Sequence, residues 1–188
     1  MSSDRVQQII EYLWPEGDSL EGSQVYAVLD GARDRRIEPM VRLSRLERAC
    51  LFSGSLTASM RAAAPYVVHL APAALFTREL LEMGWGESWG FFTVVSGDVT
   101  LEQHREHFHD LLRVKDESGR ILMFRYYDPR VLRVYLPTCT GDEARQFFGP
   151  IPRIVVETES GDGLMDYSTK QYGVNARRVT LHSDSSLA

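Results

Sequence analysis

The sequence predicts an α/β fold, a layered sheet of about five to six strands with helices packed on it, followed by a polar C-terminal arm. Short apolar runs alternate with segments of helical periodicity, which is typical of such layered folds. The 188 residues are 44% hydrophobic and 25% charged, enough for one domain with a proper core. After residue 159 the composition becomes polar. We therefore expect an α/β domain with a short N-terminal helix over 1–159 and an arm or tail over 160–188, either an appended hairpin or a segment that folds on a partner.

Short runs of apolar residues predict the strands. The run 25–31 ends in Asp-Gly and the run 49–54 ends in Ser-Gly, which are stops typical of a strand that leads into a turn. Pro65 opens the third run, at the first position of a strand, where proline is tolerated. In chain order, the predicted strands are 25–31, 49–54, 65–71, 90–97, 119–127 and 153–158.

Apolar residues spaced three and four apart predict helices between these strands. The first helix, over 4–14, is closed by Pro15. Thr100 stands at an N-cap position with Gln103 three residues later, the pattern of a capping box. Segment 56–64 fits either a loop or a short helix. In chain order, the predicted helices are 4–14, 34–46, 73–83, 100–114, 129–136 and 141–149.

Net charge, cysteine content and the absence of long apolar stretches argue against several classes of function. The net charge of −5 argues against nucleic acid as the main partner, because phosphate binding needs a basic face. The cysteines, Cys50 and Cys139, form neither a disulfide framework nor a zinc motif. The N-terminus lacks the pattern of a signal peptide, and no apolar stretch is long enough for a membrane span. We expect a soluble cytoplasmic protein without membrane insertion.

The segment 121–137, ILMFRYYDPRVLRVYLP, predicts a strand that passes directly into a helix. Asp128 stands at the N-cap of that helix and Pro129 at its first position, where proline loses no hydrogen bond. Arg125 shares a strand face with hydrophobic residues, so its guanidinium needs a carboxylate partner, and Asp128 is the expected one. Arg130 is expected to point outward. This pattern by itself indicates a well-specified turn and no particular function.

The segment FRYYDPRVLRVYLP resembles the R-F-(Y/W)-D-P-R-V-L signature of the type VI secretion effector chaperone or adaptor family. Other segments resemble the same family in the same order, and the resemblance covers roughly residues 24–150. Ala64 departs from it, since the family often has glycine there, and the tail after Ser160 matches nothing in it. The matching segments are VYAVLDGAR, CLFSGSL, APYVVHL and WGFFTVVSGDVTLEQHREHFHDLLRV.

The resemblance implies a function in binding. Members of the family are not enzymes; they hold a toxic effector in the bacterial cytoplasm and help to load it onto the VgrG spike. The expected partners are therefore a cognate effector and the C-terminus of the spike. The resemblance says nothing about the unmatched tail, which is a separate candidate for partner specificity. The candidate partner-binding or family-motif residues are Arg125, Asp128, Arg130, Trp85 and Trp89. Of these, Arg130 is the one expected to face a partner.

The histidines of HREHFH invite a metal interpretation that their spacing does not support. His104 and His107 can share a helix face, but His109 lies elsewhere, and no HExxH motif is present. We expect structural or surface histidines and no bound metal. Neither a nucleotide-binding glycine motif nor a GxSxG elbow occurs, so no catalytic residue and no cofactor are expected.

Two alternatives stay open at this point. Trp85 and Trp89 fit either core packing beside a tight turn or an exposed aromatic anchor for a partner. The chain could also be a small-molecule-binding or enzymatic α/β domain, with a pocket near Asp30 and Asp128 at the ends of strands. A third reading is an interaction module without a role in secretion.

Overall fold

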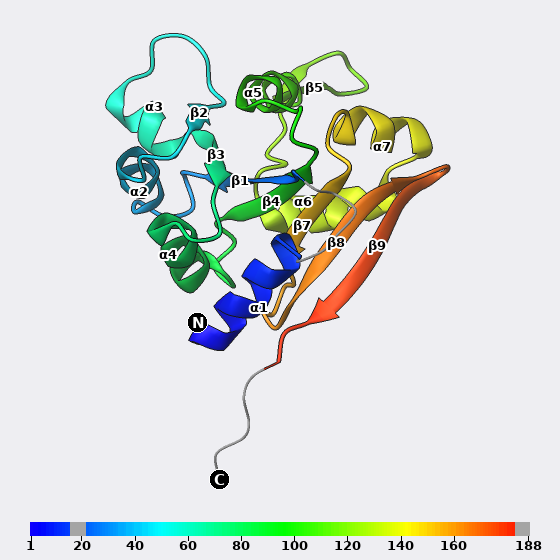
Figure 1. Cartoon of the computed structure of the whole chain (residues 1–188). Helices are drawn as coiled ribbons and strands as arrows, with labels where there is room; N and C mark the ends of the chain where they lie inside the picture. The colour runs from blue at the N-terminus through cyan, green and yellow to red at the C-terminus, as the bar shows by residue number, and fades with distance from the viewer. Residues whose placement is uncertain (16–21, 183–188) are drawn as a thin grey trace.

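The computed structural model describes residues 1–15 and 22–182 (Figure 1). It confirms the α/β class and places a seven-stranded sheet at the centre, in the order β2-β3-β1-β4-β7-β8-β9. Every neighbouring pair in this sheet is antiparallel. Five of these strands come from the domain, as expected, and the C-terminal arm adds the other two. The strands are β1 Gln24–Asp30, β2 Arg48–Cys50, β3 Pro65–Leu70, β4 Gly90–Val95, β7 Arg153–Glu157, β8 Gly163–Lys170 and β9 Gly173–Thr180, and a separate hairpin pairs β5 Arg113–Lys115 with β6 Ile121–Met123.

Helices cover both faces of the sheet (Figure 1). The helices α1, α2 and α4 pack on one face, and α5, α6 and α7 pack on the other. Among the described residues, no helix has the length and apolar character that crossing a membrane requires. The helices are α1 Ser3–Leu13, α2 Ile37–Leu43, α3 Ala58–Ala63, α4 Leu75–Gly84, α5 Leu101–Asp110, α6 Pro129–Tyr135 and α7 Gly141–Phe148, with a 3₁₀ turn η1 at Leu136–Thr138.

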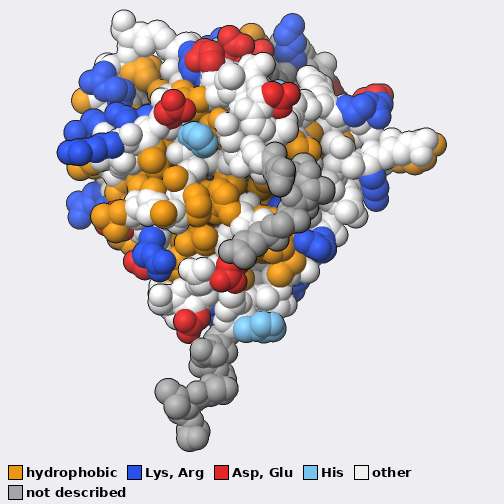
Figure 2. Space-filling model, in the orientation of Figure 1, with side chains coloured by type: hydrophobic (Ala, Val, Ile, Leu, Met, Phe, Trp, Pro, Cys, Tyr) orange, Lys and Arg blue, Asp and Glu red, His pale blue; other side chains and the backbone are white. Residues whose placement is uncertain are grey.

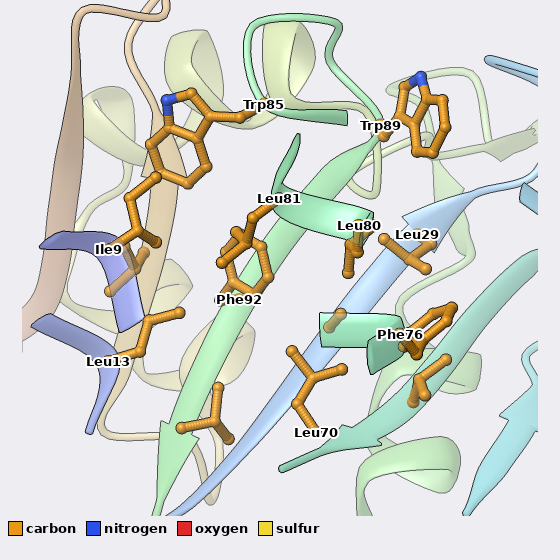
Figure 3. Close-up of a cluster of buried hydrophobic side chains, with 14 of the residues drawn as sticks. Ile9, Leu13, Leu29, Leu70, Phe76, Leu80, Leu81, Trp85, Trp89 and Phe92 are labelled. Carbon is orange, nitrogen blue, oxygen red and sulfur yellow. The ribbon is translucent and has the colours of Figure 1, made fainter. Parts of the chain in front are cut away.

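The central strand β1 contributes to two separate cores because successive side chains of a strand point to opposite faces. Val25, Ala27 and Leu29 belong to the core beneath α1 and α4, whereas Tyr26 and Val28 belong to the core beneath α5, α6 and α7. A strand that is buried on both faces carries few polar residues, as the run 25–31 does. Figure 3 shows the first core, with side chains from α1, α4 and the sheet interdigitating.

The second core is rich in aromatic side chains. Tyr126 and Phe108 stack with ring centroids 5.5 Å apart, and Phe91 meets Phe108 edge-on at 5.8 Å. The Tyr126 hydroxyl donates a hydrogen bond of 2.5 Å to the carbonyl oxygen of Phe108, so its polar end is satisfied inside the core. This contact joins the segment before α6 to the end of α5.

Two predicted strands are wrong in extent. The strand expected over 119–127 is limited to Ile121–Met123, an exposed hairpin strand. The chain then turns between Arg125 and Asp128, which brings Tyr126 and Tyr127 into the core. The strand expected over 49–54 is the three-residue β2, at the edge of the sheet. The ambiguous segment 56–64 contains the short helix α3.

The capping box predicted at Thr100 and Gln103 is confirmed, with both reciprocal hydrogen bonds formed at the start of α5. The helix itself is shorter than the predicted range 100–114. It ends at Asp110, and Arg113–Lys115 forms β5 instead.

The C-terminal arm is a β-hairpin that extends the sheet, the first of the alternatives expected for it. Leu164 and Tyr167 of β8 are buried, one on each face of the sheet. Asp166 accepts hydrogen bonds from the hydroxyl of Tyr12 on α1, at 2.5 Å, and from Nε of Arg153 on β7, at 2.9 Å. Arg177 of β9 donates to the Tyr12 hydroxyl at 2.6 Å. This network, the Tyr12–Asp166 cluster, ties the two ends of the chain together.

Candidate functional site

Asp30 is fully buried at the end of β1 and pairs with Arg125. Its Oδ1 accepts a hydrogen bond from the Ala32 backbone N–H at 3.0 Å, and its Oδ2 accepts one from Nη2 of Arg125 at 2.7 Å. The expectation that Arg125 pairs with Asp128 is therefore wrong. The strand ends before Arg125, and the following turn, closed by the Asp128 N–H to the Arg125 carbonyl at 3.0 Å, brings the guanidinium over the end of β1.

Asp128 caps α6 as the sequence predicts. Its backbone is extended, and its Oδ1 accepts a hydrogen bond from the Arg130 backbone N–H at 3.0 Å, while Pro129 occupies the first turn. The Arg130 guanidinium holds the same carboxylate through Nε at 3.0 Å and Nη2 at 2.6 Å. Burial by itself raises the pKa of Asp128, but the hydrogen bonds and charge of Arg130 outweigh it and hold the pKa below its ordinary value.

Replacing Asp128 with alanine is expected to lower the free energy of unfolding by about 1–2 kcal/mol, since the helix loses its cap and Arg130 loses its partner. Asp128→Asn keeps an acceptor for the Arg130 N–H and is expected to lose less. Urea unfolding of the two variants measures the difference. If the asparagine variant proves as unstable as the alanine variant, the cap is not what stabilises this turn.

The two buried carboxylates are held in a way that suits structure. Both oxygens of Asp30 and both oxygens of Asp128 accept hydrogen bonds from the protein. The side chains of Asp30 and Asp128 are 0% and 4% exposed. A small molecule could reach either carboxylate only by displacing an arginine.

The side chain of Arg130 is 53% exposed to solvent, although it also forms an ion pair with Asp128. It lines an open hollow of about 920 Å³ between α6 and the arm, which we call the arm hollow. Three arginines line the arm hollow, compared with one carboxylate, that of Glu159. The other lining residues are Arg133, Val134, Pro137, Thr158, Ser160, Met165, Tyr167 and Arg178.

Trp85 and Trp89 both lie in the first core (Figure 3). The Trp85 ring stacks on Phe92 with centroids 6.1 Å apart, and its Nε1–H donates to the Gly161 carbonyl at 3.2 Å. Arg36 lies over the Trp89 ring at 5.0 Å. The structure thus places both indoles as the core-packing alternative describes, and neither is an exposed anchor.

The loop between the two tryptophans is fixed by a buried carboxylate. Glu157 at the end of β7 accepts hydrogen bonds from the backbone N–H groups of Gly86 at 2.6 Å and Ser88 at 2.8 Å. Burial raises the pKa of Glu157, while these backbone donors act in the opposite direction. A Cβ at Gly84 would lie 2.8 Å from the Trp89 ring, so the close approach of α4 to this loop requires glycine.

A family model described as Domain of unknown function (DUF4123) matches residues 25–146. The chain belongs to the DUF4123 family. No curated protein and no solved structure matches the chain. The DUF4123 match begins at β1 and ends within α7, so it contains the Asp30–Arg125 and Asp128–Arg130 pairs. The helix α1 and the arm lie outside it, which means that one wall of the arm hollow comes from the DUF4123 region and the other does not.

The three histidines of the HREHFH segment do not converge. His104 is fully buried, stacks on Tyr26 at 4.1 Å and bonds to Thr93 Oγ1 through Nε2 at 3.1 Å. His107 bonds through Nε2 to the Phe147 carbonyl at 2.8 Å, and His109 lies on the surface near Ser53. Within residues 1–15 and 22–182, no group of three or more His, Cys, Asp or Glu side chains could hold a metal ion.

His104 is expected to make the fold sensitive to mild acid. Burial lowers its pKa to about 4, whereas in the unfolded chain the pKa returns to about 6.5. The unfolded state therefore takes up the proton first, and stability is complete above the unfolded pKa and is lost as the pH falls toward the folded one. From about pH 7.5 to about pH 5, His104 is expected to remove about 2 kcal/mol from the free energy of unfolding. Burial lowers the pKa of His107 in the same direction.

Urea unfolding of the wild-type chain and His104→Phe across this pH range measures that contribution. The phenylalanine variant cannot titrate, so its stability is expected to change less with pH, whatever its stability at neutral pH. Equal slopes for the two proteins would show that another group carries the acid sensitivity.

Sequence reasoning missed the Asp30–Arg125 pair and most of the arm hollow. A signal for the pair exists in the sequence, since Asp30 ends an apolar run and Arg125 interrupts another, and each needs a partner of opposite charge. No comparable signal marks Met165 or Tyr167, because their position depends on how the arm pairs with β7.

Proposed function

We propose that the protein is a type VI secretion effector chaperone, or adaptor, which binds a toxic effector in the bacterial cytoplasm and helps to load it onto the VgrG spike. The observation that carries the proposal is the DUF4123 match over residues 25–146, taken with the resemblance of FRYYDPRVLRVYLP to the signature of the adaptor family. In this proposal the chain has no enzymatic activity and uses no cofactor.

The arm hollow supports binding as the main activity. Arginine, methionine and aromatic side chains are enriched in protein interfaces, and the hollow combines Arg133, Met165 and Tyr167. Val134 on its rim is 71% exposed, which gives a partner apolar surface to cover. Since β8 and β9 lie outside the DUF4123 region, we propose that this wall of the hollow provides the specificity for one effector.

The test is co-expression of the tagged full-length chain with the products of the neighbouring genes, followed by affinity capture. We expect the chain to retain a large toxin-domain protein and to associate with a spike protein encoded nearby. Failure to capture either product from intact, folded protein would contradict the proposal.

Variants then locate the contact. Arg133 donates from Nη1 to the Glu157 carbonyl at 3.1 Å and forms no ion pair among the described residues, but its charge acts on the buried Glu157 carboxylate. Arg133→Gln therefore removes a charge from the hollow without placing a second carboxylate beside Glu157. The matched control is Arg48→Gln on β2, whose exposed side chain forms no ion pair among the described residues and likewise donates to a backbone carbonyl, that of Leu46, at 3.1 Å. We expect the first variant to weaken capture and the second to leave it unchanged.

A further inference from the structure

A second hollow lies between α2 and α4, on the opposite face of the sheet from the arm hollow, and we call it the α2–α4 groove. Its volume is about 530 Å³. Figure 2 shows hydrophobic side chains gathered over α4 and beside α2, with Lys and Arg side chains along the adjoining edge of the molecule. The residues that line the groove are Arg35, Arg36, Pro39, Met40, Leu43, Ser44, Leu75, Phe76 and Glu79.

The apolar lining is unusually open to solvent for a pair of adjacent helices. Leu43 at the end of α2 is 68% exposed, and Leu75 at the start of α4 is 71% exposed. Phe76 is buried, and Met40 packs against the first core, so these two side chains are anchored within the fold. Apolar side chains that flank a hollow and are rimmed by charges mark a surface that a partner covers.

The groove favours a helical occupant. Both of its walls are helices, whose inner backbone N–H and C=O groups already bond to each other, so they offer nothing to an extended peptide. An occupant must therefore satisfy its own backbone, and a helix does so. The α2 helix, Ile37–Leu43, is about 10 Å long and α4 about 15 Å, which is room for two to three helical turns.

Charge selects an acidic occupant on the α2 side. The segment 33–48 contains six arginines against Asp34, Glu38 and Glu47, a local net charge of +3 in a chain whose net charge is −5. Arg36 is held in place, because its Nε and Nη2 donate to Asp34 at 2.9 and 2.7 Å. Arg35 forms no ion pair among the described residues, and its guanidinium is available to a carboxylate from outside.

We propose that the α2–α4 groove binds an amphipathic helix of a partner protein, which places leucine-like side chains between Leu43 and Leu75 and carboxylates beside Arg35. The opposite wall carries Glu79, the groove's single lining carboxylate, so the occupant turns its uncharged or basic side toward α4. Such an arrangement is the helix-in-groove mode of recognition. It goes beyond the proposed function, since it specifies a binding chemistry that holds whichever protein supplies the helix.

The test uses two synthetic helical peptides of about 14 residues with the same leucine positions. One carries glutamates beside the leucines and the other carries lysines. Fluorescence anisotropy with the full-length protein measures both affinities. The acidic peptide is expected to bind at least about tenfold more tightly than the basic one. Equal affinity, or a preference for the basic peptide, would overturn the proposal.

Variants of the chain show whether binding takes place in the groove. Leu43→Ser with Leu75→Ser is expected to weaken the acidic peptide by about tenfold or more, since two apolar contacts are lost. Arg35→Glu should remove the preference for the acidic peptide, and Glu79→Gln should increase it. The matched control is Ile121→Ser, a comparably exposed apolar residue on β6, which lines neither hollow and should have no effect.

Two further outcomes would contradict the proposal that the peptide binds in the α2–α4 groove. If the double serine variant binds as well as wild type, the peptide sits elsewhere. If vesicles containing anionic lipid bind the protein through the same leucines while the acidic peptide does not, the surface contacts a membrane and the proposal is wrong. These substitutions lie at exposed positions, or at the partly exposed Glu79, so circular dichroism is expected to show unchanged folding.

Discussion

Replacing Arg125 with methionine is expected to lower the free energy of unfolding by about 3 kcal/mol, because it leaves the carboxylate of Asp30 buried without a cation. Asp30 is fully buried at the end of the central strand, and within the described chain its one ion pair is the 2.7 Å contact with Arg125. Methionine keeps much of the length of the side chain, so the change removes charge more than packing. Urea unfolding at neutral pH measures the effect.

A double-mutant cycle separates the pair from its surroundings. Asp30→Asn in the Arg125→Met background removes the unpaired charge and keeps an acceptor for the Ala32 N–H, so part of the stability is expected to return. The matched control is Arg120→Met, which breaks an exposed pair with Asp116 and should cost less than about 1 kcal/mol. An equal loss in Arg125→Met and Arg120→Met would show that the burial of Asp30 has no energetic consequence.

Ending the chain after Glu159, at the predicted domain boundary, is expected to abolish cooperative folding. The truncation removes β8 and β9, and with them Leu164 and Tyr167, one buried side chain from each core. It also removes Asp166, the acceptor that joins Tyr12 to Arg153. Each large apolar side chain contributes about 1.5–3 kcal/mol by burial, and β7 loses its hydrogen-bonded neighbour as well, so the sum approaches the whole stability of a domain.

Thermal melts followed by circular dichroism test this expectation. A chain that ends after His182 retains all the strands of the sheet and serves as the control, with a melting temperature close to that of the full chain. If the chain 1–159 melts cooperatively at a similar temperature, the arm is an independent appendage and not part of the fold.

The features of the fold that could be predicted from the sequence depend on residues close together in the chain. The N-cap at Asp128, the proline at position 129 and the capping box at Thr100 involve residues within a few positions of each other, so their chemistry does not depend on the rest of the fold. The apolar run of β1 likewise reports directly that both of its faces are buried.

The features that could not be predicted from the sequence depend on contacts between segments that are far apart in the chain. Two carboxylates act on Arg125, that of Asp128 three residues away and that of Asp30 ninety-five residues away, and the turn after β6 determines that Arg125 pairs with Asp30. The strands of the arm could not be predicted from its polar sequence. Its last strand, β9, lies at the edge of the sheet, and most of its side chains face solvent, so it lacks an apolar run. The groove lies between α2 and α4, which are separated in the sequence by β2, α3 and β3, so no single segment of the sequence predicts it.

The Tyr12–Asp166 cluster has a consequence for how the protein is made. Its hydroxyl–carboxylate contact joins residues 154 positions apart, and Gln8 meets the backbone of His182 across 174 positions. During synthesis, the first helix leaves the ribosome long before its partners on β8 and β9 exist. The apolar face of this helix, with Ile9 and Leu13, can pack against β1, β4 and α4 earlier, but the contacts of Tyr12 and Gln8 that fasten the helix to the arm form only when translation is almost complete.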